Sequence, residues 1–542
     1  MRGYGDYPRT EDPEYKKLTR WIRDDHVGGF IVANHIYDGS VMSAHPFQMV
    51  AFINHMQRVA KTPLLVASDF EHGASMRVSG TAKFPYLMAF GAAHDLTGVR
   101  ALGAATAQEA HTLGVNWIFA PDADVNNNPA NPIINVRSYG ENPQAVADAV
   151  SAFIEGAHSD PRNYMLVTAK HFPGHGDTSE DSHMQMAKLD QPKERIESVE
   201  LVPFRAAIEH GVDAIMTAHM SVPAFEPAGI PSTVSRNVLT GLLRDELGFK
   251  GLVVTDAMDM QGLAALYSQG DAAVRAIEAG ADVLLMPSDP EACIRALMAA
   301  VKSGRISRQR INASAAKIME AKQRVGLFRS RLTSLDQIPD SLEDPAFGKL
   351  AQNVADRAVT LVRDDKHLFP IPDSADGSCL VIMSEGLFSQ HGQAMVRILQ
   401  QRIPQMKTYL VHPSTPVDEL TAIATGTGQC KQIYVAAFVT VAAYRGSLGL
   451  EGGLNAFMNA IVHGPVPVAL VSLGNPYLLG DFPNVAAYAA TFSTTVTSEE
   501  AAAKAMLGDI PITGKMPVSI PGISKLGDGI NVPAKTAKVA MR

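Results

Sequence analysis

The chain has 542 residues, of which 46% are hydrophobic and 19% are charged, and its formal net charge is −8 at pH 7. This length predicts two or more domains, and an acidic balance without a dense Lys/Arg run gives no support for nucleic-acid binding. No apolar run approaches the roughly 18 residues of a membrane-spanning helix. The polar opening of the sequence shows no secretory signal. The compartment therefore stays undecided between the cytoplasm and the periplasm or exterior, and the oligomeric state stays open.

Up to about residue 330, short apolar runs rich in β-branched residues alternate with Ala-rich helical patterns. Apolar strands that alternate with helices are typical of a parallel sheet, and their spacing predicts a (β/α)8 barrel. The runs lie at residues 27–33, 63–69, 117–124, 164–172, 214–220, 251–258 and 281–286. An eighth strand would have to precede residue 1. We therefore expect a barrel that lacks its first strand or is irregular there.

Residues 331–350 are polar and predict a linker between a barrel domain, residues 1–330, and a second domain, residues 351–542. In the second domain, apolar runs return between helical patterns and predict a smaller α/β sandwich. They lie at residues 358–362, 380–383, 408–411, 433–439 and 467–471. Because this domain holds no comparable cluster of ionisable residues, we expect it to cover one side of the barrel or to mediate assembly.

Three cysteines, Cys293, Cys379 and Cys430, lie far apart in the sequence. Their spacing matches neither a disulfide framework nor a zinc site. We expect buried thiols that pack as small hydrophobic side chains.

Polar or ionisable residues end most of the barrel runs, although a strand used only for packing would not need them. In an α/β barrel the carboxyl ends of the strands converge on one rim, where reaction centres lie. For any single residue the alternative is a turn or a helix cap, but the recurrence favours a shared site. The residues are Asp69, Asp122, Asp124, Lys170, His171, His219 and Asp256.

The segment 170–183 is the densest group of ionisable residues, with the sequence Lys-His-Phe-Pro-Gly-His-Gly-Asp-Thr-Ser-Glu-Asp-Ser-His. Its Pro and Gly residues predict a loop. Near its end, Asp181 and His183 are two residues apart, so in an extended chain their side chains point the same way. The carboxylate can then hold one imidazole nitrogen while the other transfers a proton. The alternative is that Asp181 caps a turn and His183 is exposed.

Asp256 brings a carboxylate to the end of the run that begins at Gly251. A carboxylate suits nucleophilic attack on an acetal carbon, because negative charge stabilises an oxocarbenium-like transition state. Asp259 is the alternative carboxylate, or it is a helix cap.

Four further residues could bind a polyhydroxylated substrate. Arg137, Lys170 and His171 are mainly donors, and Asp69 can accept hydrogen bonds from a pair of sugar hydroxyls. For Arg137 and Lys170 the alternative is a salt bridge with a carboxylate at the barrel rim.

Two other functional classes are compatible with parts of the sequence. A metal-dependent barrel hydrolase could use zinc-compatible ligands in the 170–183 loop, namely His171, His175, Asp177, Asp181 and His183. However, no His-x-His pair closes an early strand, and His175 between two glycines is expected to hold the loop. A sugar-binding protein without catalysis is the other class, and the joint presence of Asp256, Asp181 and His183 argues against it.

These segments resemble glycoside hydrolase family 3, and within it the β-N-acetylglucosaminidases. The 170–183 segment is similar to their Lys-His-Phe-Pro-Gly-His-Gly loop, which ends in Asp-Ser-His and is usually lacking in members that act on glucosides. Residues 254–260, Val-Thr-Asp-Ala-Met-Asp-Met, resemble the nucleophile segment. Residues 67–73 resemble the segment whose Asp binds the non-reducing sugar, although Phe70 and His72 depart from the usual Asp-Gln-Glu-Gly-Gly.

The resemblance implies a retaining, exo-acting β-N-acetylglucosaminidase without cofactor or metal. It implies that Asp256 is the nucleophile and that Asp181 and His183 form the acid/base dyad, with sugar-binding residues Asp69, Arg137, Lys170 and His171. The implied substrate is a small carbohydrate, either a peptidoglycan fragment or a chitin oligomer, and peptidoglycan recycling is the commonest role in this branch.

Two alternatives within the family stay open. One is a β-glucosidase. The other is a phosphorylase, because a neutral imidazole base leaves the acceptor site less negative, so that phosphate could replace water.

Overall fold

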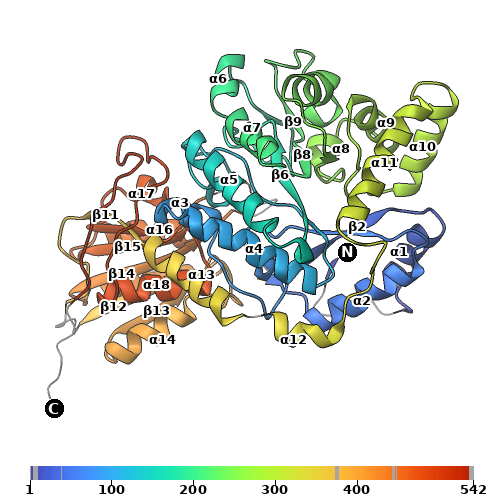
Figure 1. The fold of residues 1–542 in the computed structure, drawn as a ribbon. Coiled ribbons are helices and arrows are strands. Elements are labelled where there is room, and N and C mark those ends of the chain that lie inside the picture. The colour runs from blue at the N-terminus through green and yellow to red at the C-terminus, as the bar shows by residue number, and fades with distance from the viewer. Residues whose placement is uncertain are drawn as a thin grey trace.

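Two β-sheets organise the chain into two domains. The computed structural model describes residues 2–3, 10–37, 40–342, 344–372, 377–441, 446 and 448–535. The barrel domain, blue to yellow-green in Figure 1, contains an eight-stranded sheet, and the second domain, orange and red, contains a six-stranded one. The predicted fold, a TIM-like barrel followed by an α/β sandwich, is confirmed.

The barrel strands are parallel and follow the order β1-β2-β4-β5-β6-β8-β10. Their bounds are β1 Arg2–Gly3, β2 Gly29–Tyr37, β4 Leu65–Ser68, β5 Trp117–Ile118, β6 Leu166–Phe172, β8 Ala214–Thr217 and β10 Leu252–Thr255. A short strand, β3 (Ser40–Met42), pairs antiparallel with β2. Two more, β7 (Ala187–Lys188) and β9 (Met220–Ser221), pair with each other.

Two predicted strands differ from the structure. The first barrel strand, expected to be lacking or irregular, is the two-residue strand β1, which pairs in parallel with β2 and is too short to leave an apolar pattern. The run at 281–286 forms a single parallel bridge between Val254 and Val283. There the side chain of Asp282 accepts the backbone N–H of Val253 at 3.1 Å, so a carboxylate takes the place of a backbone partner.

Helices alternate with the barrel strands and cover them on the outside (Figure 1). Their buried faces are rich in Ala, which allows close contact, as between α4 and α5. Among the described residues, no helix combines the length and the apolar character required to cross a bilayer. Their bounds are α1 Pro13–Arg23, α2 Pro46–Val59, α3 Leu87–Ala93, α4 Leu96–Thr112, α5 Pro143–Ala157, α6 Lys193–Ser198, α7 Leu201–Glu209, α8 Gln261–Ala264, α9 Gln269–Ala279, α10 Pro290–Lys302 and α11 Arg308–Arg324, with a π-helix at Asn237–Glu246.

The second domain has the strand order β11-β16-β15-β14-β12-β13, in which β11 is antiparallel to β16 and the other pairs are parallel. The strands are β11 Thr360–Asp364, β12 Ser378–Met383, β13 Lys407–Val411, β14 Gln432–Val439, β15 Val468–Gly474 and β16 Ala487–Ala490. The helices are α14 Gln393–Arg402, α15 Val417–Thr427, α16 Leu454–Val462, α17 Leu478–Asp481 and α18 Val496–Leu507. Strand β16, Ala-Tyr-Ala-Ala, was not predicted because it has no β-branched residue.

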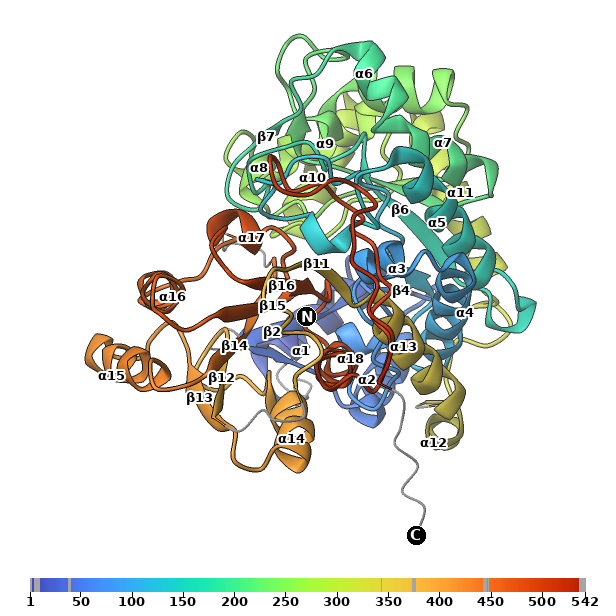
Figure 2. The same cartoon turned by 90° about the vertical axis from the view of Figure 1, so that its left-hand side faces the viewer.

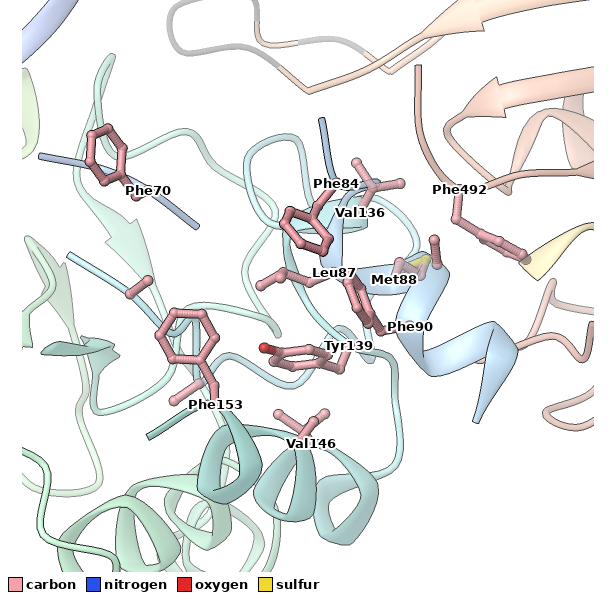
Figure 3. Close-up of a cluster of buried hydrophobic side chains, with 14 of the residues drawn as sticks. Phe70, Phe84, Leu87, Met88, Phe90, Val136, Tyr139, Val146, Phe153 and Phe492 are labelled. Atoms are coloured by element: carbon pink, nitrogen blue, oxygen red, sulfur yellow. The ribbon is translucent and has the colours of Figure 1, made fainter. Parts of the chain in front are cut away.

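The two domains share a continuous apolar core. Within the segment between the two sheets, α12 (Ile338–Ser341) is followed by α13 (Pro345–Ala358), which packs against both α3 of the barrel domain and α18. In Figure 3, Phe492, which lies just after β16, is beside helix α3, which carries Met88 and Phe90. Phe492, Met88 and Phe90 belong to one buried cluster. Helix α3 is therefore held between the domains.

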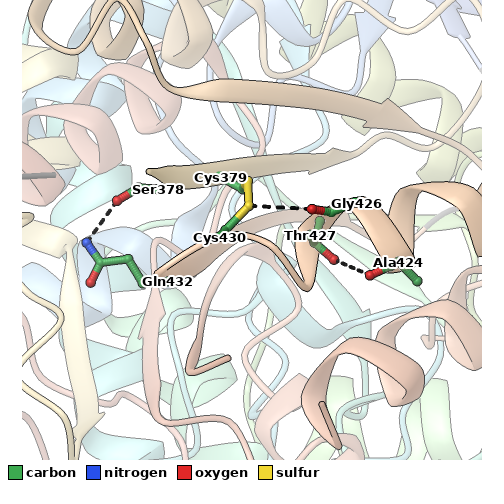
Figure 4. Close-up of a disulfide and its surroundings, with 7 residues drawn as sticks. All are labelled: Ser378, Cys379, Ala424, Gly426, Thr427, Cys430 and Gln432. Atoms are coloured by element: carbon green, nitrogen blue, oxygen red, sulfur yellow. Dashed lines mark hydrogen bonds between the residues drawn. A yellow bond between two sulfur atoms is a disulfide. The ribbon is translucent and has the colours of Figure 1, made fainter. Parts of the chain in front are cut away.

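The cysteines differ from the expectation of three free thiols. Cys379 on β12 and Cys430 just before β14 form a disulfide, with their Cα atoms 6.0 Å apart (Figure 4). Strands β12 and β14 are neighbours in the sheet, so the fold brings together two residues that lie 51 positions apart. Sequence spacing alone could not reveal this pairing. Cys293 is a buried free thiol, as expected.

Loss of this disulfide should destabilise the second domain. Replacing Cys379 and Cys430 together by Ala is expected to lower the free energy of unfolding by about 2–4 kcal/mol, because the unfolded chain loses a crosslink. Denaturant titration of the oxidised wild type and the double variant measures this difference. A thiol count in denaturant without reductant should give one thiol, that of Cys293, per chain. A count of three would show that the cysteines are unpaired.

Candidate active site

A buried lysine links the carboxyl ends of two barrel strands. Lys170, near the end of β6, is 2% exposed, and its Nζ donates to Asp69 Oδ1 at 3.0 Å. The same Nζ lies 2.7 Å from Glu71 Oε1. Burial alone would lower the pKa of Lys170, but Asp69 and Glu71 outweigh this effect and raise it. Asp69, directly after β4, also accepts from Arg77 at 3.2 Å.

Glu71 is the central anion of this network. Arg137 donates to it through two nitrogens, Nε to Oε2 at 3.0 Å and Nη2 to Oε1 at 2.9 Å. This is the strong two-point geometry of an Arg–carboxylate pair. Burial would raise the pKa of Glu71, but Arg137 and Lys170 outweigh this effect and hold it well below its usual range.

Glu71 was not among the residues predicted from the sequence. The salt bridges considered as the alternative for Arg137 and Lys170 are both present, and both reach Glu71. Glu71 lies in a turn, and both of its partners come from segments far along the chain, so no local pattern marks it.

Asp124 fixes the orientation of His171. Its Oδ2 lies 2.8 Å from His171 Nδ1, so the proton resides on that nitrogen and Nε2 faces Arg137 Nη2 at 3.5 Å. Asp124 also accepts the backbone N–H groups of His171 and His175, at 3.3 and 2.6 Å. Its carboxylate therefore ties the end of β6 to the loop that follows.

His175 holds the loop after β6, as the sequence predicts. Its Nδ1 lies 2.8 Å from the hydroxyl of Thr178, and its Nε2 lies 3.0 Å from that of Ser182. Burial lowers the pKa of His175 to about 4, so the ring is neutral at pH 7. The flanking Gly176 is required because a Cβ there would lie 1.9 Å from the carbonyl oxygen of Val125.

Asp181 and His183 form a hydrogen-bonded pair in this loop. His183 Nδ1 lies 2.7 Å from Asp181 Oδ1, which also accepts the backbone N–H of His183 at 2.9 Å. The Asp181 side chain is 2% exposed, whereas that of His183 is 24% exposed. The carboxylate thus holds one side of an imidazole whose other nitrogen can exchange a proton.

Asp256 directly follows β10 at the same end of the barrel. Its Oδ1 accepts the backbone N–H of Ala257 at 2.7 Å. Burial would raise the pKa of Asp256, but His171, His219 and His183 outweigh it and lower the pKa. Asp256 is therefore a carboxylate at neutral pH, whereas Asp259 is exposed to solvent.

Backbone contacts bring the loop of His183 next to the turn of Asp256. Gln261 N–H donates to the carbonyl of His183 at 3.3 Å, and Gly262 N–H donates to that of Ser182 at 3.2 Å. His219, at the end of β8, is buried and lies 3.0 Å from the carbonyl of Ala257, so it supports the turn. All the residues predicted for catalysis and sugar binding therefore gather at one end of the barrel.

Asp122 is a buried carboxyl in the middle of these charges. Burial and the nearby Glu71 raise its pKa well above the usual range. Asp122, Asp124 and His171 form the one group in the described part of the chain with geometry suited to a metal ion. Arg137 Nε lies 3.6 Å from Asp122 and His171 Nδ1 is bonded to Asp124, whereas neither buried carboxyl oxygen of Asp122 has a hydrogen-bond partner. The zinc ligands considered in the 170–183 loop are separated, since His175 is bonded to hydroxyls and Asp177 to Gln191.

Comparison with known proteins agrees with this arrangement. Residues 11–321 match the family described as "Glycosyl hydrolase family 3 N terminal domain". The chain belongs to glycosyl hydrolase family 3. It is therefore a glycoside hydrolase, with its barrel in the matched region.

Similar proteins extend the match beyond the barrel. The chain is 29% identical over 528 residues to the "Beta-N-acetylglucosaminidase/beta-glucosidase" of Cellulomonas fimi, covering 94% of this chain and 91% of the relative. It is 32% identical to "Beta-hexosaminidase A" of Pseudoalteromonas piscicida over 68% of this chain and 64% of that protein. The solved structure of a family 3 β-N-acetylglucosaminidase from Paenibacillus sp. str. FPU-7 superposes with a TM-score of 0.84 at 32% identity, covering 96% of this chain and 97% of that one.

Removal of the charge on Glu71 should destabilise the protein in a pH-dependent way. Glu71→Gln leaves Arg137 and Lys170 buried without their shared anion, so the free energy of unfolding at pH 7 should fall by about 3–5 kcal/mol. Glu155→Gln, which removes an exposed ion pair with Arg100, is the matched control and should cost about 0–1 kcal/mol.

The pH dependence follows from the lowered pKa of Glu71. The stabilisation that ionised Glu71 provides is complete above pH 4.5, the ordinary pKa of a Glu side chain. This stabilisation is lost as the pH falls toward the lowered pKa of Glu71 in the folded protein. The difference between wild type and Glu71→Gln should therefore be full at pH 7 and shrink below pH 4.5. Urea titrations across this range measure it. A difference independent of pH would contradict the account.

Proposed function

We propose that this glycoside hydrolase releases terminal β-linked N-acetylglucosamine with retention of configuration. The observation that carries the proposal is the Asp181–His183 hydrogen bond at 2.7 Å in the loop that contacts the turn of Asp256. A nucleophile and a proton donor are the two groups that retaining hydrolysis needs. The names of the relatives from Cellulomonas fimi and Paenibacillus support N-acetylglucosamine as the sugar.

In the first step the carboxylate of Asp256 attacks the anomeric carbon. The bond to the leaving oxygen breaks, and that oxygen takes the proton from Nε2 of the His183 imidazolium. A glycosyl ester of Asp256 forms. Asp181 keeps its negative charge throughout and stabilises the imidazolium through Nδ1, as the carboxylate does in other His–Asp pairs.

In the second step the neutral His183 takes a proton from water. The water oxygen attacks the anomeric carbon, and Asp256 leaves as a carboxylate. The sugar is released as the β-anomer, and the His183 imidazolium is restored for the next cycle. The same nitrogen serves both steps, because Nε2 gives its proton to the leaving oxygen in the first step and takes one from water in the second.

Four residues beside this centre are assigned to the non-reducing sugar. Asp69 and Arg137 keep 23% and 19% of their side-chain surface exposed, so their polar atoms can reach sugar hydroxyls. His171 presents Nε2, because Nδ1 is occupied by Asp124. Lys170 is almost completely buried, so its assigned contribution is to hold Asp69 and Glu71 in place and supply positive charge.

The natural substrate is proposed to be a small carbohydrate with a terminal N-acetylglucosamine. Peptidoglycan fragments are preferred and chitin oligomers are the alternative, on the family resemblance. The buried network around Lys170 is proposed to bind only the non-reducing end of the substrate. The enzyme would then remove sugars one at a time from that end, which is exo-action.

Substitution of the two carboxylates at the β10 turn should separate their roles. With p-nitrophenyl β-N-acetylglucosaminide, Asp256→Asn should abolish turnover, because the nucleophile is lost. Asp259→Asn, the matched control, should leave turnover near that of wild type. His183→Ala should lower kcat by about 10²–10⁴-fold, because general acid–base catalysis is lost.

Three results of the same assay would contradict the proposal. They are turnover of the β-glucoside alone, loss of activity in Asp259→Asn rather than Asp256→Asn, and no effect of His183→Ala. Product analysis with and without phosphate tests the acceptor. Hydrolysis predicts free N-acetylglucosamine in both, whereas a sugar 1-phosphate would assign a phosphorylase.

A further inference from the structure

One segment of the barrel domain, which is bonded to its own domain, is also bonded to the second domain. Residues 126–141 follow β5 and carry Arg137 in the 3₁₀ turn Asn135–Arg137. Five hydrogen bonds join this segment to the second domain: Asn126 Nδ2 to Tyr477 Oη at 2.8 Å, Asn135 Nδ2 to Asn475 Oδ1 at 3.1 Å, Glu141 N to Pro517 O at 3.0 Å, Ser519 N to Glu141 Oε2 at 2.7 Å, and Ser519 Oγ to Glu141 Oε1 at 2.6 Å.

The segment also fits closely against the second domain. A Cβ at Gly140 would lie 2.6 Å from the carbonyl oxygen of Pro517, so only glycine allows this approach. Val136 and Tyr139 point into the apolar cluster around Phe84, Leu87 and Phe90 (Figure 3). In Figure 2 the red segment after α18 runs alongside the barrel domain, and its Lys515 N–H donates to the carbonyl of Ala92.

Asn475 lies at the centre of these contacts, directly after β15. It is 3% exposed, and both atoms of its amide are bonded. Nδ2 donates to the carbonyl of Leu448 at 2.9 Å, and Oδ1 accepts the backbone N–H of Tyr477 at 3.1 Å. A carbonyl can only accept and a backbone N–H can only donate, so these partners fix which amide atom is oxygen. Asn135 must therefore donate to that oxygen.

Asn135 has a backbone conformation that needs support. Its φ is +40°, in the left-handed region that residues other than glycine rarely occupy, and its side chain is buried. This conformation starts the turn that directs Arg137 toward Glu71. The hydrogen bond to Asn475 is the contact from the second domain that holds Asn135 itself.

We propose that Asn475 is a positioning residue for substrate binding, because it holds Asn135 and so sets the place of Arg137. This rests on the proposed role of Arg137 in binding the sugar. The second domain then contributes to the active site through a buried hydrogen bond rather than through a catalytic group. A small displacement of a binding group is costly, since productive geometry tolerates only small errors.

Loss of the Asn475 amide should weaken substrate binding more than the chemical step. In Asn475→Ala the buried Nδ2 of Asn135 loses its acceptor, and KM for p-nitrophenyl β-N-acetylglucosaminide should rise about five- to tenfold with kcat nearly unchanged. Asn135→Ala, made in the barrel domain, should give the same rise. The KM of the double variant should be little higher than that of either single variant, because both changes remove the same hydrogen bond.

Thr497→Val is the matched control. It removes another hydrogen bond between the domains, from Thr497 Oγ1 to Lys83 O at 3.1 Å, away from residues 126–141. Its KM should equal that of wild type. Hydrogen exchange of peptides from 126–141 should be faster in Asn475→Ala and Asn135→Ala than in Thr497→Val, and circular dichroism melts report any general loss of stability.

Several outcomes would overturn the proposal. They are an unchanged KM and unchanged exchange in a folded Asn475→Ala, or an equal rise of KM in Thr497→Val. If Asn475→Ala does not fold, the KM of Asn135→Ala and the hydrogen exchange of its peptides from 126–141 test the proposal instead. If wild type turns over only the β-glucoside, the proposed sugar is wrong. The KM comparison is then made on that substrate, and hydrogen exchange tests the positioning in either case.

Discussion

The buried ion cluster of Glu71, Arg137 and Lys170 is the constraint on which the rest of the site depends. Buried charges are tolerated only when they are paired with good geometry, so each member fixes the other two. The three side chains come from the segments after β4, after β5 and at the end of β6. Their pairing therefore defines the relative positions of three consecutive strand ends, and with them those of Asp69 and His171.

In the proposed mechanism the site has two halves. The sugar-binding half carries fixed charges, because Lys170 stays protonated and Glu71 stays ionised. The catalytic half contains the partly exposed His183, proposed to transfer the proton, and the carboxylate of Asp256. His171 connects the halves, since it contacts Arg137 and lowers the pKa of Asp256. The second domain contacts this site through its hydrogen bonds to residues 126–141, the segment that carries Arg137.

Much of this molecule could be predicted from sequence patterns with a local physical cause. The barrel and the sandwich follow from apolar runs. The Asp181–His183 pair was predicted for an extended loop, but the structure forms it in a turn, where Asp181 also accepts the backbone N–H of His183. Glu71, the Cys379–Cys430 disulfide and Asn475 could not be predicted, because each acquires its partner only when distant segments meet in the fold. Strand β1 was missed for a different reason, since it is too short to carry a pattern. The strand predicted at 281–286 is reduced to a bridge at Val283, because a side chain of Asp282 replaces part of its backbone pairing.

The central claim is that His183 moves the proton of the leaving group while Asp256 holds the sugar. The most direct test is the dependence of kcat/KM on leaving-group acidity for aryl β-N-acetylglucosaminides, in wild type and His183→Ala. Without the acid, poor leaving groups should react far more slowly, good ones should be nearly unaffected in the first step, and azide should restore turnover of the glycosyl ester. Equal loss for every leaving group, without rescue by azide, would show that His183 is not the acid/base.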